Sequence, residues 1–397
     1  MKSRGTVYLL TGCMALQQTA LSLNMTVAAL AGTMLAGSQP YLATLPLALT
    51  FVVLMASSVP ASMLIGRIGW KPTFALGSMV GCAGGLISAY AMVVQSFWLF
   101  CVGLAVYGFA TAVANYYRFA AAESVPHEQR SRAISTVLTG GVIAAILGPF
   151  LAVKGSDFFV YSFAGSYIVM AVLSISILPV LATVRLNLEL PGGERESAEH
   201  APRSLGAIAR QPVFLIAALG AMLGYGSMNL IMVSTPTAMV ACGFVMADAA
   251  SVIQWHVLGM YLPSFFSGHL IRRFGATRIM GLGAVIVMIC AVINLTGIAY
   301  ANFLSSLVLL GLGWNFLYVG GSTLVTEAYR PGERSRTLGL NEVMVTGMTA
   351  VTALSSGAIF AEAGWAILNL AVLPPLVVLT VAIAWFSVHR RRSVALT

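Results

Sequence analysis

Apolar runs of about twenty residues follow one another along almost the whole chain, and no other feature restricts its fold as strongly. A helix needs about 20 apolar residues to cross the hydrocarbon core of a bilayer. Gly and Pro are tolerated inside such runs, because neighbouring helices can satisfy the backbone groups left over. We therefore predict an all-α integral membrane protein with twelve transmembrane helices. The runs lie at 6–35, 42–65, 73–94, 98–122, 133–153, 161–184, 212–238, 249–271, 279–299, 303–326, 338–360 and 365–388.

The composition excludes a soluble protein. Only 8% of the 397 residues are charged and 59% are hydrophobic, whereas soluble domains carry about 25% charged residues. The net charge of +9 does not indicate a nucleic-acid partner, since that would need a basic face on a soluble domain. The basic residues instead form short clusters between the apolar runs, so the lipid bilayer is the expected partner.

The Lys and Arg residues predict the orientation. Of the 21, Arg118 lies inside a run and Lys154 follows the fifth run. The other 19 fall at the N-terminus, in alternate loops, in the polar segment 185–211 and in the tail at 389–392. Cytoplasmic loops carry an excess of Lys and Arg, so we expect a multi-pass protein of the bacterial cytoplasmic (inner) membrane with both termini in the cytoplasm. The first run is too long for the 7–15-residue core of a signal peptide and is expected to remain as the first helix.

Motifs for enzymatic chemistry are missing from the sequence. There is no GxxxxGK[ST] and no HExxH, and no set of Ser, His and Asp that twelve spans would gather in one pocket. We therefore expect neither an enzyme nor an ATP-driven pump, and no cofactor or metal. The five cysteines all lie in apolar stretches without CxxC spacing, which favours small buried side chains over ligands or disulfides.

Two halves of the chain repeat each other. The polar break SMLIGRIGWKP at 62–72 is echoed by GHLIRRFGATR at 268–278. Equivalent positions recur at nearly constant offsets, which predicts an N-terminal six-helix bundle (1–184), a cytoplasmic linker (185–211) and a C-terminal six-helix bundle (212–397). The matches are Arg67-Ile68-Gly69 with Arg273-Phe274-Gly275, 206 residues later; Glu123 and Arg130-Ser131-Arg132 with Glu327 and Arg334-Ser335-Arg336, 204 later; and Asn24 with Asn229, 205 later.

On these residues the whole chain resembles the major facilitator superfamily of secondary transporters, which has six plus six helices and a cytoplasmic linker. The signature of that family between helices 2 and 3 has Gly, three residues, Asp-Arg, one residue, and Gly. This chain keeps Arg67 and Gly69 but has Ser62 at the first position and Gly66 in place of Asp. Ala144 to Pro149 is similar to the Gly-Pro core of the motif associated with antiporters, without its trailing Gly pair, and Leu104 replaces the usual helix 4 Arg.

The resemblance implies a solute site near the bilayer midplane between the two halves, where polar side chains are expensive and therefore functional candidates. Arg118 has two readings of equal weight. It binds an anionic or carbonyl-bearing solute, or it reaches the interface or pairs with Glu123 as a structural residue. For the Asn and Gln candidates, the alternative to cavity lining is hydrogen bonding between helices. The substrate-binding candidates are Gln17, Asn24, Asn115, Tyr117, Arg118, Tyr225, Asn229, Trp255, His256, Asn315 and Tyr318.

Charged residues at the cytoplasmic helix ends suggest a gate. The resemblance implies that Arg67 with Glu123, and Arg273 with Glu327, close the inner face, while ordinary interfacial charge is the alternative. Proton coupling has three candidates, Glu123, His256 and Glu342, of which Glu342 is the most deeply embedded carboxylate.

The function we expect is secondary active transport of a small organic solute, anionic or aromatic, by rocker-switch alternating access in a monomer. Export by a multidrug or metabolite antiporter is one alternative. A non-transporting membrane sensor or assembly factor is the alternative of another class, and the missing Asp of the loop signature in both halves is its support. The sequence leaves open the substrate, the direction of transport and the coupling ion.

Overall fold

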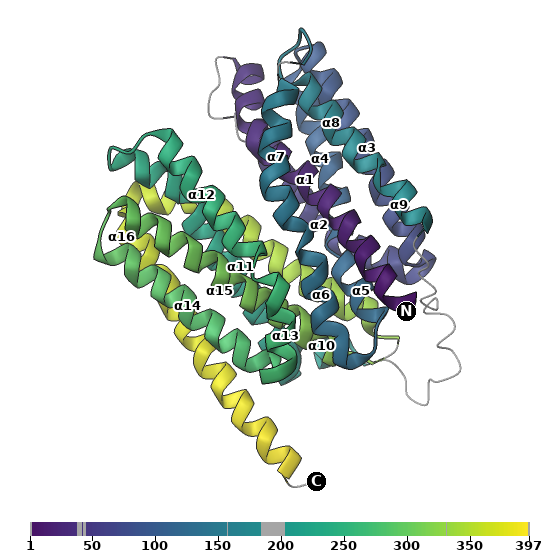
Figure 1. The fold of residues 1–397 in the computed structure, drawn as a ribbon, viewed down its shortest axis with the longest axis vertical. Coiled ribbons are helices and arrows are strands. Elements are labelled where there is room, and N and C mark those ends of the chain that lie inside the picture. Colours follow the sequence, from purple (N-terminus) through teal and green to yellow (C-terminus); the bar gives the residue numbers. More distant parts are fainter. Residues whose placement is uncertain are drawn as a thin grey trace. The chain divides into compact units, whose positions relative to one another are not determined.

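The computed structural model describes residues 2–37, 42, 45–156, 158–183, 203–330 and 332–395. These residues form helices, turns and bends, with no strand among them (Figure 1). The chain divides into two compact units, and each is described by itself. Unit 1 contains Met1–His127, Thr136–Ala201 and Leu338–Val343, and unit 2 contains Glu128–Ser135, Pro202–Thr337 and Met344–Thr397.

The first unit is built mainly from the helices of the N-terminal half. Helix α3 packs against α4 and α8, α2 packs against α4, and α1 packs against α7. The core contains Phe100, Tyr107 and Tyr167, and the rings of Phe100 and Tyr167 meet edge to face with centroids 5.1 Å apart. The helices of this half are α1 (Lys2–Ala36), α2 (Leu45–Ile68), α3 (Trp70–Val93), α4 (Phe97–Ala114), α5 (Tyr117–Glu123), α6 (Arg130–Leu138), α7 (Gly140–Ser156), α8 (Ala164–Ile175) and α9 (Ile177–Thr183), with the 3-10 turn η2 (His127–Gln129) before α6. Residues 128–135, which include most of η2 and α6, belong to unit 2.

The second unit repeats this pattern. Helix α15 packs against α11, α12 and α14, and hydrogen bonds join α14 to α16 through Asn294 and Asn369 at 2.8 Å. The pairs α12–α15 and α14–α15 correspond to α2–α4 and α3–α4 of the first unit. The helices are α10 (Leu205–Ala209), α11 (Pro212–Ala241), α12 (Met246–Tyr261), α13 (Ser264–Phe274), α14 (Ala276–Thr296), α15 (Tyr300–Leu324) and α16 (Arg334–Ala395), with the 3-10 turn η4 (Val325–Glu327) after α15.

The predicted spans are helical over most of their described residues. Nine helical segments of the described chain are long and apolar enough to cross a membrane, and the bent α1 would be a tenth. The predicted run 249–271 is divided between α12 and α13 at Pro263, whose ring cannot continue the helical hydrogen bonds. The runs 338–360 and 365–388 both lie in α16, which is broken at Gly364 by a φ of 77°.

The cysteines are free in the described residues. Cys13, Cys101 and Cys290 are buried, but Cys82 is half-buried and Cys242 is exposed at the end of α11. Cys242 follows the last residue of α11 as its C-cap and lies beyond the predicted run 212–238, which is why it is not buried with Cys13, Cys101 and Cys290.

The glycines of the two repeated breaks have the same unusual backbone. Gly69 precedes α3 with φ 88° and ψ 173°, and Gly275 precedes α14 with φ 88° and ψ 150°. This conformation is open almost only to glycine, because a Cβ atom would clash with the local backbone. The repeat of Gly69 and Gly275 in the sequence therefore reflects the same sharp turn between the second and third helix of each half.

We expect Gly275→Ala to destabilise unit 2 by about 1–3 kcal/mol, the cost of placing a non-glycine residue in this region. No heavy atom lies within 4 Å of an added Cβ at Gly275, so backbone strain is the whole effect. Gly281→Ala in the same α14 is the control, since its Cβ would meet Ile383 at an ordinary 3.7 Å and alanine favours the helix. Thermal unfolding of the purified protein in detergent compares the two, and equal melting temperatures would contradict the prediction.

Candidate functional site

An arginine and a glutamate form a buried ion pair in unit 1. Arg118, in α5, is 0% exposed, and its Nη2 donates to Oε1 of Glu342 at 2.5 Å. Glu342 is 1% exposed and lies in Leu338–Val343, the short stretch of α16 that belongs to this unit. Arg118 therefore does not reach out to the membrane interface. It is held inside the protein by a carboxylate 224 residues away in the chain.

Further polar contacts stabilise the buried pair. Nη1 of Arg118 donates to the carbonyl oxygen of Asn115 at 2.6 Å, and Nδ2 of Asn341 donates to Oε1 of Glu342 at 3.0 Å. The guanidinium also lies 4.3 Å from the ring centroid of Phe119. Burial of two charges is tolerated only when such additional hydrogen bonds replace their water shells. Asn115 contributes through its backbone, whereas its side chain was the predicted ligand.

Each unit includes a short helical stretch from the other half of the sequence. Residues 128–135 belong to unit 2, where Oγ of Ser131 donates to the carbonyl oxygen of Gly268 at 3.1 Å. The amide of Gly268 donates to Oγ of Ser135 at 3.2 Å, and Ser135 also donates to the carbonyl oxygen of Ser264. A Cβ atom at Gly268 would lie 2.7 Å from Cα of Arg132, so only glycine permits this approach.

The corresponding stretch of the second half packs in unit 1 in the same way. Gly339 faces Ser62, and a Cβ atom at Gly339 would lie 3.2 Å from Cβ of Ser62. Ser62 and Gly268 are 206 residues apart, and Ser135 and Gly339 are 204 apart, which are the offsets of the internal repeat. The two contacts are therefore equivalent, with glycine and serine exchanged between their sides. Ser62 replaces the first Gly of the loop signature. The glycine that allows the close contact at this position is Gly339, on the facing helix α16.

Two amides of α1 are buried in unit 1. Gln17 donates from Nε2 to the hydroxyl of Tyr107 at 3.1 Å, which is the interhelical contact that was the alternative to cavity lining. Asn24 is fully buried, and neither its Oδ1 nor its Nδ2 has a hydrogen-bond partner among the described residues. The ring of Tyr117 packs edge to face on Phe74 at 4.6 Å, within the core.

In unit 2 the predicted aromatic residues of α11 and α15 meet. The ring of Tyr225 lies edge to face with Tyr318 at 5.0 Å and with Trp314 at 5.2 Å. One turn after Tyr225, Nδ2 of Asn229 donates to the carbonyl oxygen of Thr349 at 3.0 Å. Of the predicted residues, Tyr225 and Tyr318 are therefore in contact, while Asn229 bonds to α16, and Trp314 joins the two tyrosines without having been among the candidates.

Trp255 and His256 of α12 point in different directions. Trp255 is 51% exposed on the surface of unit 2, whereas His256 is 0% exposed and its Nδ1–H donates to the carbonyl oxygen of Leu307 at 2.7 Å. This bond favours a structural role for His256 over proton coupling. Asn315 is likewise buried, and its Nδ2 donates to the carbonyl oxygen of Met260 at 2.8 Å and to Oγ of Ser264 at 2.6 Å.

The predicted gate pairs are not brought together. Arg67 is exposed at the end of α2 and forms no ion pair within the described residues, and Glu123 is half-buried at the end of α5. Arg273 is exposed with its guanidinium 5.3 Å from the ring centroid of Phe274, and Glu327 is exposed in η4. A gate role for these four residues stays a prediction.

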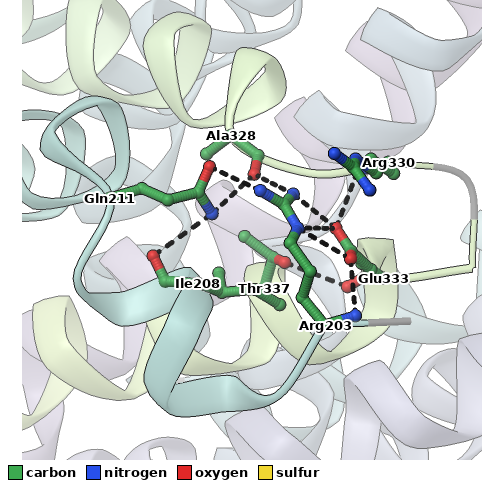
Figure 2. A network of polar contacts seen from close by, with 7 residues as sticks. All are labelled: Arg203, Ile208, Gln211, Ala328, Arg330, Glu333 and Thr337. Atoms are coloured by element: carbon green, nitrogen blue, oxygen red, sulfur yellow. Dashed lines mark hydrogen bonds and ion pairs between the residues drawn. The ribbon is translucent and has the colours of Figure 1, made fainter. Parts of the chain in front are cut away.

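Sequence reasoning missed a second ion pair, which joins the end of the linker to the loop before α16 (Figure 2). Arg203 donates from Nε and Nη2 to the carboxylate of Glu333 at 2.9 and 2.6 Å. The backbone amides of Arg203 and Arg330 also donate to this carboxylate, at 2.8 and 3.0 Å. Nη1 of Arg203 donates to Oε1 of Gln211 at 2.9 Å. The rest of the predicted linker, up to Pro202, lies outside the described residues.

The carboxylate of Glu333 is strongly held in its charged form. Its hydrogen bonds from Arg203, together with the two backbone amides, lower the pKa of Glu333 to about 2. The same contact raises the pKa of Arg203. Glu333 is 1% exposed, so its charge depends on Arg203 rather than on water. A Glu next to basic residues in a loop gave no signal in the sequence that it would be buried.

Comparisons with known proteins give a consistent result. The model of the Major Facilitator Superfamily matches residues 7–255 and 217–396. The riboflavin transporter RfnT of Brucella anthropi is 35% identical over 373 residues, which are 94% of this chain and 93% of that protein. The uncharacterized MFS-type transporter YdeG of Bacillus subtilis is 28% identical over 370 residues, 88% of this chain and 84% of that protein.

Solved structures of this superfamily share the fold at low sequence identity. The transporter FucP in an outward conformation has a TM-score of 0.78 and 15% identity, covering 96% of this chain and 98% of that one. The proton:xylose symporter XylE has a TM-score of 0.79 and 12% identity, covering 97% of this chain and 96% of that one. At these identities the likeness establishes the arrangement of helices alone.

Proposed function

This chain belongs to the major facilitator superfamily and is a multi-pass secondary transporter, and from that premise we propose that its solute is riboflavin or a closely related flavin. The observation that carries the proposal is the 35% identity with a riboflavin transporter over 94% of the chain. Riboflavin joins a flat aromatic ring system to a polyol. The clustered aromatic side chains of α11 and α15 are suited to stacking on the ring system of riboflavin.

We propose that transport proceeds by alternating access, with residues 128–135 and 338–343 as its moving contacts. Each of these stretches packs in the unit that contains mainly the other half of the chain. Access cannot alternate unless at least one of them changes partners. The buried pair of Arg118 with Glu342 fixes the second stretch by an ion pair of 2.5 Å, and protonation of Glu342 would weaken it. We therefore propose this pair, rather than His256, as the point where proton binding and conformational change are coupled.

We propose further that the protein lies in the bacterial cytoplasmic membrane with both termini in the cytoplasm and works as a monomer. The basic residues of alternate loops support this orientation. The exposed apolar side chains on many helices, such as Val153, Val378 and Trp98, are suited to lipid contact.

Transport of riboflavin is testable in two ways. In cells that can neither make nor import riboflavin, expression of the protein is expected to restore growth on low external riboflavin and to allow uptake of radiolabelled riboflavin. In proteoliposomes, unlabelled riboflavin inside should drive counterflow of labelled riboflavin, and xylose or fucose should not compete. A protonophore that abolishes accumulation but leaves counterflow intact would support coupling to protons. Absence of counterflow with riboflavin would refute the proposed solute, and binding without counterflow would favour a sensor.

A further inference from the structure

Four aromatic rings of unit 2 form one connected cluster. Tyr225 of α11, Tyr261 at the end of α12, and Tyr318 of α15 each contact the ring of Trp314, which also lies in α15. Trp314 stacks on Tyr318 with centroids 4.9 Å apart and an interplanar angle of 20°. Tyr225 and Tyr261 each meet Trp314 edge to face, at 5.2 and 5.8 Å. Three helices therefore converge on a single indole.

The four aromatic side chains of the cluster differ in their exposure to solvent. Trp314 is 1% and Tyr318 is 4% exposed, whereas Tyr225 and Tyr261 are only half-buried. The two tyrosines thus form an accessible rim, and the two residues of α15 form a floor. A flat ring that enters from the rim would stack on tyrosine side chains and reach the indole, a mode of binding that aromatic side chains provide for any planar π system.

Two polar groups beside the rings have no hydrogen-bond partner. Within the described residues, the Nε1–H of Trp314 donates to nothing, and Oδ1 of the neighbouring Asn315 accepts from nothing. Asn315 is 0% exposed, and its Nδ2 donates to the carbonyl oxygen of Met260 and to Oγ of Ser264, so this amide faces the junction of α12 and α13 on either side of Tyr261. Buried donors and acceptors are rarely left unpaired. One free donor and one free acceptor match the carbonyl and imide N–H groups at the edge of a flavin ring.

We infer that Tyr225, Tyr261, Trp314 and Tyr318 form a subsite for a planar, fused heteroaromatic ring, with the Trp314 indole and the Asn315 amide as its polar contacts. The inference rests on the proposed function in that it assigns the isoalloxazine ring of riboflavin to this subsite. The proposed subsite should also bind planar fused rings other than riboflavin, because the four aromatic side chains contact the flat ring and not the polyol chain.

Flavin fluorescence provides the test, since stacking on tyrosine or tryptophan quenches it. Riboflavin is titrated into the purified full-length protein in detergent, with lumichrome as the ring alone and ribitol as the chain alone. The wild-type protein is expected to quench riboflavin and to bind lumichrome, and ribitol should not compete. Tyr225→Leu and Tyr261→Leu are each expected to raise the Kd for riboflavin at least roughly tenfold, while Tyr225→Phe, which keeps the ring, should stay within about threefold of the wild type.

Phe266→Leu is the matched control, because Phe266 is an exposed ring of the same unit whose partner is Phe316 at 6.5 Å; its Kd should not change. Melting temperatures confirm that each variant is folded, and Trp314→Phe replaces the floor residue with a smaller ring that lacks the donor. Unchanged Kd values in Tyr225→Leu, Tyr261→Leu and Trp314→Phe would overturn the subsite and leave riboflavin transport standing. If the wild type ignores riboflavin but binds lumichrome through Tyr225 and Tyr261, the proposed solute fails and the subsite stands. Binding of neither compound overturns both.

Discussion

Arg118→Met is expected to lose most transport and to unfold at a markedly lower temperature than the wild type. The substitution leaves the Glu342 carboxylate inside the protein without the guanidinium that lies 2.5 Å from it. Removal of one partner from a buried ion pair costs about 3–5 kcal/mol, because the remaining charge is neither paired nor hydrated. Glu342→Met should have a similar effect for the same reason, since it leaves Arg118 buried.

The double variant Arg118→Met/Glu342→Met separates stability from mechanism. Apolar side chains of similar volume can replace a buried ion pair without loss of stability, so the double variant is expected to regain much of the wild-type melting temperature. If the pair couples conformational change to proton binding, accumulation of riboflavin driven by a proton gradient should nevertheless remain low. Arg272→Met, which removes an exposed Arg at the end of α13, is the control and should change stability by less than about 0.5 kcal/mol.

Thermal unfolding in detergent and proton-driven accumulation of riboflavin in proteoliposomes together distinguish a structural role from a coupling role. A double variant that is both stable and active would show that Arg118 and Glu342 serve only to hold residues 338–343 in unit 1. A single variant that unfolds at the wild-type temperature would contradict the expected energy of the pair. The proposal requires low stability in the single variants, high stability in the double variant, and low transport in all three.

The helices and their repeat could be predicted because the information is local. About twenty apolar residues cross a bilayer wherever they occur in the chain, and Gly69 and Gly275 mark the same sharp turn in both halves. The breaks inside spans were harder to place. Pro263 interrupts one predicted run and Gly364 separates two helices by a single residue, and neither effect changes the average polarity of the surrounding sequence.

The site was predictable only in part, because it depends on which face of each helix packs inward. Trp255 and His256 are neighbours in an apolar run, yet one is exposed and the other fully buried. Spacing of three or four residues placed Tyr225 and Asn229 on one face of a helix but could not select the helix opposite. The partner of Arg118 is 224 residues away, whereas Glu123, the nearer carboxylate, was the obvious choice from the sequence.

Glu333→Gln is the second variant with a large expected effect. The pKa of Glu333 is lowered to about 2 from an ordinary value of about 4.3. A carboxyl group whose pKa is lower in the folded state stabilises that state above its unfolded pKa, and this contribution disappears as the pH falls through the folded pKa. The shift corresponds to about 3 kcal/mol. The contribution should therefore be constant from pH 8 to about pH 5 and should decrease progressively below about pH 4.3.

The expected result is a melting temperature that is several degrees lower for Glu333→Gln than for the wild type at pH 7, with a smaller difference at pH 3.5. A local measurement accompanies it, because Arg203 is itself a trypsin site. In the wild type its guanidinium is held by Glu333 and Gln211, so cleavage after Arg203 should be slow, and in Glu333→Gln it should be faster. Glu128→Gln, which neutralises an exposed carboxylate of the same unit, should change neither measurement. Equal trypsin cleavage after Arg203 in Glu333→Gln and the wild type would show that the ion pair does not anchor the end of the linker, because the released arginine would then be no more accessible than the bound one.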